Sequence, residues 1–236
     1  MFLSGDEISR FEGTGEVNEA GETLAEFLEK YDPNRYENPC NTVDTLVFTY
    51  TEEEKNGELV RSISKLLLIK RGNHPSIGWW ALPGGFVEFR EDIHESAARE
   101  LKEETGIDGL EICQLKSYGD YDRDPRTRII TTAYVALVPE GELKAVAADD
   151  AKDVAWFALS DMVVSGVCKD GIKKDTHKLM LHSEEKNIWI GADVEVSTRM
   201  GTILPQKHYK VISSNKLASD HGAIILEGYH YVKGLL

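Results

Sequence analysis

The sequence predicts an α/β fold in which strands and helices share one core. Two apolar stretches, Val43–Tyr50 and Ile63–Lys70, have the composition of β-strands. A capped amphipathic helix is predicted over Ile93–Thr105, and a final helix over Lys216–Gly234. The 236 residues are enough to bury a substantial core, since 41% of them are hydrophobic and 29% are charged.

Residues 1–40 are predicted to form an N-terminal helical extension. The first 17 residues are polar and contain three glycines. A short helix is expected from Glu22 to Tyr31, where Leu24 and Phe27 fall on one face. Because proline disfavours helix in the residue before it, this helix should end at Asp32-Pro33.

The helix over Ile93–Thr105 has signals at both of its ends. Asp92 is placed to cap the N-terminus, and Glu95 three residues later completes a capping-box pattern. Gly106 suits the position that follows the last helical turn. The strand Ile63–Lys70 before it is apolar enough to be buried on both faces.

The second half of the chain is predicted to add more strands. Ile129–Val138 and Val154–Leu159 are expected to complete the sheet. Residues 163–215 are expected to form a β-rich insertion before a closing helix within 216–236. Its short strands are expected at Lys178–His182, Asn187–Ile190 and Val194–Ser197, with turns at residues 183–186 and at Gly191.

The charge argues against two classes of partner. Acidic residues outnumber basic ones 41 to 27, for a net charge of −14, and there is no run of Lys and Arg. Nucleic acids and anionic membranes need such basic residues, so neither is expected as a partner. No signal peptide and no membrane-spanning stretch are expected. The three cysteines, Cys40, Cys113 and Cys168, form no metal or disulfide spacing and fit a reducing, cytoplasmic location.

The segment from Gly85 to Ile107 carries the chemistry. Glu100 lies three and four residues before Glu103 and Glu104, so all three carboxylates project to neighbouring positions on the predicted helix. Such clustered oxygen ligands are what hard cations such as Mg²⁺ bind, together with substrate phosphates. The preceding Gly84-Gly85 bend lets the backbone approach, so that a main-chain carbonyl could join the ligands.

This segment resembles the Nudix box, Gx5Ex7REUxEExGU, where U is aliphatic, and matches it at every defined position. The flanking stretches WALPGGFVE and YDRDPRTRIITTAYVAL resemble the ADP-ribose pyrophosphatase-like branch of the Nudix hydrolase superfamily. The resemblance implies an α/β/α sandwich around a mixed sheet. It assigns residues 41–162 to the Nudix domain and 216–236 to its closing helix.

The resemblance also assigns roles to individual residues. Glu100, Glu103 and Glu104, with the carbonyl of Gly84, would bind Mg²⁺, or Mn²⁺ in its place. Glu91 would pair with Arg99 to brace the helix. The residues expected to be catalytic are Glu91, Arg99, Glu103 and Glu104. The family commonly takes a further carboxylate from a later loop. Asp150, beside Asp149, is the candidate here, although an ordinary acidic turn explains these residues equally well.

An arginine-rich stretch follows the box. Arg123, Arg126 and Arg128 suit bidentate contacts to phosphate, and the ring of Tyr121 offers a surface on which a base could stack. A charged hairpin loop is the alternative. With the family resemblance, we expect these four residues to contact substrate.

The predicted function is metal-dependent hydrolysis of a pyrophosphate bond in a nucleoside diphosphate linked to another moiety. ADP-ribose, cut to AMP and ribose 5-phosphate, is the first substrate to consider. One alternative is a nucleoside triphosphate pyrophosphohydrolase. Another is an ADP-ribose-sensing transcriptional regulator, against which the complete glutamate cluster and the β-rich, acidic 163–215 segment both count. Because many members of the family dimerise, a homodimer is expected.

Overall fold

The structure is a computed structural model, and it describes residues 8–148, 151–203 and 206–236. The chain divides into two compact units, residues 1–38 and 39–236. The first unit contains helix α2 (Leu24–Lys30), which lies within the predicted range. Thr23 caps this helix: its Oγ1 accepts from the Glu26 N–H at 3.3 Å, and Glu26 Oε2 accepts from the Thr23 N–H at 2.9 Å.

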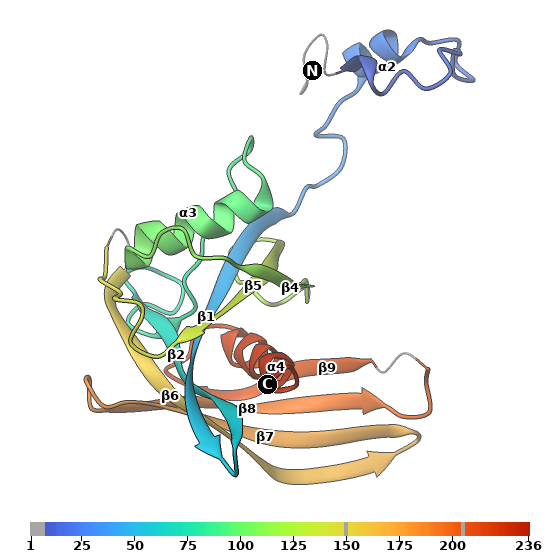
Figure 1. Cartoon of the computed structure of the whole chain (residues 1–236). Helices are drawn as coiled ribbons and strands as arrows, with labels where there is room; N and C mark the ends of the chain where they lie inside the picture. The colour runs from blue at the N-terminus through green and yellow to red at the C-terminus, as the bar shows by residue number, and fades with distance from the viewer. Residues whose placement is uncertain (1–7, 149–150, 204–205) are drawn as a thin grey trace. The chain divides into compact units, whose positions relative to one another are not determined.

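The second unit is built on one mixed sheet, which is nine-stranded in the described part of the chain (Figure 1). The strand order is β4-β5-β1-β2-β6-β7-β8-β9, and β3 pairs with β2 at one side. β1 runs parallel to β5, whereas the other neighbours are antiparallel. The bounds are β1 Cys40–Lys55, β2 Glu58–Arg71, β3 Trp80–Ala81, β4 Cys113–Tyr118, β5 Ile129–Pro139, β6 Ala151–Lys169, β7 Ile172–Ser183, β8 Ile188–Arg199 and β9 Lys207–Asn215.

Helices cover both faces of this sheet, α3 (Ile93–Thr105) on one and α4 (His221–Lys233) on the other. Successive residues of a strand point to opposite faces. On β1, Leu46 belongs to the core that contains α4, and the next residue, Val47, to the core that contains α3. Both faces of the central strands are therefore buried, and the predicted α/β/α sandwich around a mixed sheet is confirmed.

The two main helices match their predictions to different degrees. α3 has the predicted bounds, and Gly106 ends it in the left-handed conformation (φ 72°) with its N–H donating to the Lys102 carbonyl. α4 was predicted to begin at Lys216, which is wrong, because it begins at His221. Lys216 (φ 61°) and Ser219 (φ 44°) are left-handed and cannot continue a right-handed helix.

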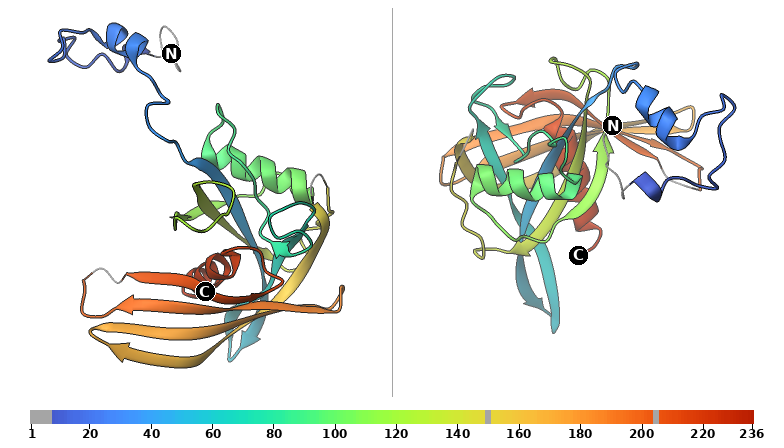
Figure 2. Two further views of the ribbon diagram at one scale, coloured as in Figure 1. Left: turned by 180° about the vertical axis from the view of Figure 1, so that it is seen from behind. Right: turned by 90° about the horizontal axis from the view of Figure 1, so that it is seen from above.

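The segment 163–215 continues the sheet. The boundary expected between residues 162 and 163 falls inside β6, and β7, β8 and β9 extend the same sheet outward (Figure 2). Gly191 was predicted to be a turn, but it lies inside β8, where it pairs with Met180 on one side and Asn215 on the other. Glycine is required here by close packing and not by a turn, because a Cβ at this position would overlap the backbone carbonyl of Leu179.

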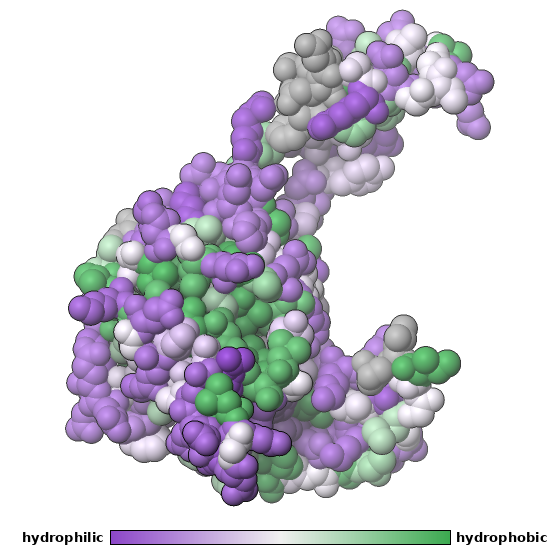
Figure 3. Space-filling view, viewed as in Figure 1, coloured by the Kyte–Doolittle hydropathy of each residue, from purple (hydrophilic) through white to green (hydrophobic). Residues whose placement is uncertain are grey.

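Polar residues dominate the margins of the face shown in Figure 3, and hydrophobic residues gather in its middle, below α3. None of the helices in the described residues is long and apolar enough to cross a membrane.

Substituting Gly191 by alanine tests the packing of β8. We expect Gly191→Ala to lower the free energy of unfolding by about 1–3 kcal/mol, because the new methyl group must displace the Leu179 backbone. Gly119→Ala is the control, since its nearest contacts would lie at an ordinary 3.7 Å. Denaturant unfolding measures both, and equal stability of the two variants would contradict the packing described.

Candidate functional site

A cavity of about 430 Å³ lies where β1, residues 82–86, α3 and the start of α4 meet. Charged side chains of both signs line it. The acidic ones are Asp44, Glu88, Glu100, Glu103, Glu104 and Asp124, and the basic ones are Arg71, Arg99, Arg123 and Arg126. A cavity in which carboxylates and guanidinium groups face one another can hold cations and phosphates together.

Helix α3 presents three glutamates to this cavity. Glu104 is buried, with 7% of its surface exposed, whereas the side chains of Glu100 and Glu103 are 15% and 43% exposed. Neighbouring Leu101 points into the core and fixes which side of the helix faces the cavity. The structure therefore brings together the three carboxylates predicted from the sequence.

The Gly84-Gly85 segment packs directly on these carboxylates. The Gly84 N–H donates to Glu104 Oε2 at 2.8 Å. A Cβ at Gly85 would overlap the Glu100 carboxyl group, and one at Gly84 would overlap the carbonyl of Val43 on β1. Only glycine at both positions allows the backbone to lie between β1 and the helix.

The hydrogen bonds of this segment show which way its carbonyls point. Pro83 accepts from the Thr45 N–H at 2.8 Å, and Gly85 accepts from the Val43 N–H at 2.9 Å, so both carbonyls face β1. The Gly84 N–H between them faces Glu104 instead. The segment is thus held by β1 on one side and by α3 on the other.

Arg99 holds the acidic cluster together. Its Nε donates to Glu91 Oε1 at 2.9 Å, and its Nη1 donates to Glu100 Oε1 at 2.7 Å and Glu103 Oε2 at 2.9 Å. Its Nη2 also donates to the Phe86 carbonyl at 3.1 Å. The ion pair expected between Glu91 and Arg99 is present, and one guanidinium group thus orients three carboxylates and the loop.

The electrostatics of the cluster fit a divalent cation. The pKa of Glu104 is raised to about 8, chiefly by burial and also by the charges of Glu100 and Asp44, although the Gly84 N–H and Arg71 act to lower it. Added positive charge stabilises the ionised form of a buried carboxylate that lies among other carboxylates. A hard cation would supply that charge, and the donor set of carboxylate and carbonyl oxygens suits Mg²⁺.

Of the four residues expected to contact substrate, the structure places two at the cavity and two elsewhere. Arg123 and Arg126 line the cavity, and Arg126 also lies over the Phe86 ring, 5.2 Å from its centroid. Arg128 and Tyr121 are not among the described residues that line it. Arg128 donates to the carbonyls of Gly119 and Asp120, and Tyr121 is 82% exposed.

Arg123 is more constrained than the sequence suggests. It donates through Nε and Nη2 to the Asp220 carboxylate at 2.8 and 2.9 Å, and its side chain is only 6% exposed. Arg126 makes the corresponding bidentate pair with Asp124, two residues away. Arg123 therefore fastens the loop to the start of α4, whereas the more exposed Arg126 is the freer of the two.

Sequence reasoning missed Asp44 and His221, which lie side by side on the cavity wall. Asp44 accepts from Thr131 Oγ1 at 2.6 Å, and its Oδ1 lies 3.8 Å from His221 Nε2. His221 Nδ1 accepts from the Leu82 N–H at 2.9 Å, so a neutral ring carries its hydrogen on Nε2, facing Asp44. A charged residue inside an apolar strand was the signal that could have indicated Asp44. The predicted Asp150, with Asp149, lies outside the described residues.

A profile of the NUDIX domain matches residues 46–175 of the chain. The chain is 42% identical over 117 residues to the ADP-ribose pyrophosphatase of Methanocaldococcus jannaschii, which covers 50% of the chain and 68% of that relative. It is 40% identical over 114 residues to the ADPR responsive transcriptional repressor NtrR of Acinetobacter baylyi, which covers 48% of the chain and 42% of the repressor. The crystal structure of a MutT/nudix family protein from Enterococcus faecalis aligns with a TM-score of 0.61 and 31% identity, covering 99% of this chain and 76% of the other.

Substituting Glu91 by glutamine tests the bracing by Arg99. We expect Glu91→Gln to lower the free energy of unfolding at pH 7 by about 1–2 kcal/mol, because charge-assisted hydrogen bonds are lost. The hydrogen bonds from Arg99 hold the pKa of Glu91 below its ordinary value. Its contribution is therefore present above the unfolded-state pKa of about 4.3 and is lost as the pH falls through the lower folded-state value.

The gap in stability between wild type and Glu91→Gln should thus narrow as the pH is lowered from 7 toward 3. Glu111→Gln serves as the control, because Glu111 is exposed, and its effect should stay within about 0.5 kcal/mol at either pH. Urea unfolding at several pH values makes the comparison. A gap that stays constant across this range would show that ionised Glu91 does not brace the helix.

Proposed function

The chain belongs to the NUDIX domain family, and from that premise we propose that it hydrolyses the pyrophosphate bond of a nucleoside diphosphate linked to another moiety. It is a Nudix hydrolase. The observation that carries the proposal is the packing of Glu100 and Glu104 against Gly84-Gly85, with Glu103 and several arginines in the same cavity. ADP-ribose is the proposed substrate, with AMP and ribose 5-phosphate as products, because the relative from Methanocaldococcus jannaschii is named an ADP-ribose pyrophosphatase.

The proposed cofactor is Mg²⁺, with Mn²⁺ as the substitute. Glu100, Glu103 and Glu104, with the Gly84 carbonyl, are the groups that would hold it. When bound, such an ion neutralises the charge that develops on the phosphates and lowers the pKa of water. The side chain of Arg99 orients Glu100 and Glu103 through hydrogen bonds.

The remaining residues of the cavity would bind and orient the substrate. Hydrolysis forms a bond from the oxygen of water to one phosphorus atom and breaks the bond from that phosphorus to the bridging oxygen. The attacking water gives up a proton, and the cavity carboxylates are the groups able to accept it. Arg126 and the Phe86 ring at the cavity offer a cation for phosphate and a flat apolar surface for a base.

Two alternatives follow from the same site. A nucleoside triphosphate pyrophosphohydrolase would use the same glutamates and would release pyrophosphate instead of two monophosphates. The repressor from Acinetobacter baylyi favours a regulator as the other alternative. Against a regulator, the described residues between 163 and 215 form strands and turns of the sheet, whereas a DNA-binding helix-turn-helix needs a pair of helices. Binding of a specific promoter fragment would favour the regulator.

Four further features complete the proposal. We propose a cytoplasmic location, supported by three free, exposed cysteines, which a reducing compartment would preserve. We propose a homodimer, which sedimentation would test. We also propose that residues 163–215 are an insertion relative to a minimal Nudix domain, and that Asp150 adds a further carboxylate to the site.

Glutamine substitutions test the metal-binding glutamates. Glu103→Gln and Glu104→Gln should each lower kcat for ADP-ribose with Mg²⁺ by at least about two powers of ten, equivalent to some 2.7 kcal/mol of barrier. Glu142→Gln, an exposed carboxylate in a turn, should keep wild-type activity. Chromatographic identification of AMP and ribose 5-phosphate defines the reaction. Wild-type rates in both variants, or no cleavage of any nucleoside diphosphate derivative, would refute the proposal.

Arginine substitutions test whether Arg126, which lines the cavity, contributes more to catalysis than Arg128, which does not. Arg126→Ala should reduce kcat/KM for ADP-ribose by about tenfold, since a charge-assisted phosphate contact contributes at least about 1.4 kcal/mol. Arg128→Ala should change it by less than about threefold, because Arg128 is bound to backbone carbonyls away from the cavity. Steady-state kinetics distinguish the two variants. Equal losses in both would mean that the whole loop contacts substrate.

A further inference from the structure

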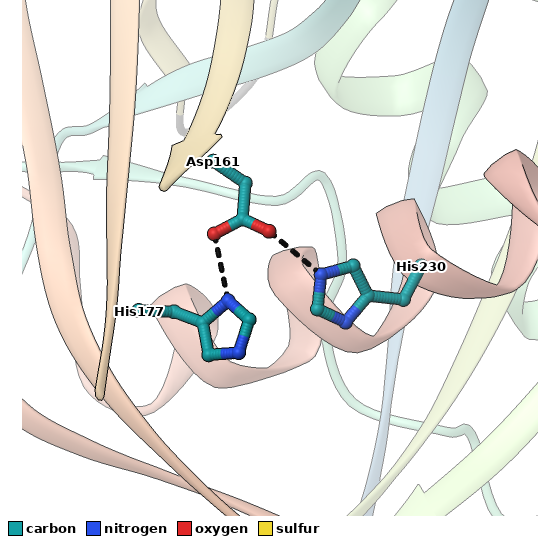
Figure 4. Close-up of side chains that lie close together, drawn as sticks. All are labelled: Asp161, His177 and His230. Atoms are coloured by element: carbon teal, nitrogen blue, oxygen red, sulfur yellow. Dashed lines mark hydrogen bonds and ion pairs between the residues drawn. The ribbon is translucent and has the colours of Figure 1, made fainter. Parts of the chain in front are cut away.

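A second cluster of metal-ligating side chains lies away from the glutamates, on the face of the sheet that α4 covers. Asp161 Oδ1 lies 2.8 Å from His177 Nδ1, and Asp161 Oδ2 lies 2.8 Å from His230 Nε2. The potential ligand atoms all lie within 4.8 Å of one another. Figure 4 shows both imidazole rings directed at the single carboxylate.

Three separate elements bring these side chains together. Asp161 on β6 pairs in register with Leu179 on β7, and His177 lies two residues before Leu179, so that Asp161 and His177 are diagonal neighbours on one face. His230 reaches the same place from the last turns of α4. Such an arrangement depends on the tertiary fold, and no local sequence spacing would reveal it.

We propose that Asp161, His177 and His230 form a transition-metal site, suited to Zn²⁺, that fastens α4 to β6 and β7. Two imidazoles and one carboxylate are a donor set that zinc uses, with a water molecule in the fourth position. Zinc bonds of about 2.0–2.1 Å in a tetrahedron place ligand atoms about 3.3 Å apart. The two pairs at 2.8 Å would therefore have to open by only about half an ångström.

The surroundings of the cluster support an ion more than a plain hydrogen-bonded triad. The side chains of Asp161 and His177 are 12% and 10% exposed, and within the described chain the partners recorded for Asp161 are these two histidines. A carboxylate that lies mostly out of water is stabilised by a cation bound beside it. The two carboxylate oxygens of Asp161 each face one imidazole nitrogen, so the carboxylate and both rings are already directed at one another.

A neighbouring residue is placed to orient one of the ligands. Tyr209 Oη on β9 lies 3.2 Å from His230 Nδ1, the nitrogen that does not face Asp161. A metal-ligating histidine usually donates its other N–H to such a group, which fixes the ring and its tautomer. In the ion-bound form His230 would carry its hydrogen on Nδ1 and donate to Tyr209. The side chain of His230 is 24% exposed, which leaves access for an ion and a water molecule.

The two sites should select different ions. Imidazole nitrogen favours Zn²⁺, Co²⁺ and Ni²⁺, whereas carboxylate and carbonyl oxygens favour Mg²⁺ and Mn²⁺. The histidine cluster would thus bind zinc in an excess of magnesium, and the glutamates would bind magnesium. The proposal does not rest on the proposed function, because a protein that cleaves no nucleotide could still bind zinc here.

The experiment uses the untagged full chain, stripped with a chelator and titrated calorimetrically with Zn²⁺ in excess Mg²⁺. We expect one zinc ion per chain. His177→Gln and His230→Gln should each weaken binding by about a hundredfold or more, and Tyr209→Phe by about tenfold. His208→Gln, an exposed histidine on β9, and Glu103→Gln in the other site should both bind zinc like the wild type.

Two further measurements separate ligand loss from misfolding. Co²⁺ bound to the folded wild type should give the intense visible spectrum of four-coordinate cobalt, and Zn²⁺ should displace it. Zn²⁺ should raise the Tm of the wild type and leave that of His177→Gln unchanged. No zinc uptake by the wild type, or equal affinity in the wild type and both histidine variants, would overturn the proposal. Loss of hydrolysis in Glu103→Gln with zinc binding intact would leave it standing.

Discussion

The hydrogen bond from the Gly84 N–H to the Glu104 carboxylate joins helix α3 to the Gly84-Gly85 segment, which is itself held by β1. A buried carboxylate is costly unless it is hydrogen-bonded, so α3 can bury Glu104 only where a donor faces it. That donor is available because β1 holds the neighbouring carbonyls of Pro83 and Gly85. The backbone of the central sheet therefore sets the position of the glutamates. Because the sheet is rigid, it holds the site in a defined geometry.

The same helix carries an electrostatic conflict that the fold does not remove. Glu100, Glu103 and Glu104 repel one another at helical spacing, and Arg99 offsets only part of this repulsion. A sequence selected for stability alone would separate these charges, because each such pair weakens the helix by a few tenths of a kcal/mol. The fold instead compensates elsewhere, through the Asp92 cap, the Gly106 end and the burial of Leu101. Like charges gathered on a well-capped helix are typical of a functional site, and here they suit the binding of a cation.

How far the sequence could predict the structure depended on the range of the interactions. The bounds of α3 and the clustering of its three glutamates were predicted correctly, because capping, periodicity and spacing are local signals. The start of α4 was wrong because Lys216 and Ser219 adopt left-handed conformations that nothing in their side chains requires. The anchoring of Arg123 by Asp220 joins residues that are 97 positions apart, and no pattern along the chain indicates such a partner. Gly191 shows the converse error, in which a glycine signals close packing inside a strand and not a turn.

Helix α4 contributes residues to both the glutamate cavity and the second cluster. Its N-terminal His221 lines the glutamate cavity, and the adjacent Asp220 holds the arginine loop through Arg123. His230 lies nine residues further along, about 14 Å at the rise of an α-helix, and belongs to the second cluster. A helix moves along its axis as a rigid body, so whatever fastens His230 to β6 and β7 also fixes where His221 and Asp220 lie. The strands of the 163–215 segment would then act on the cavity without touching it, by fixing the position of the helix that forms part of its wall.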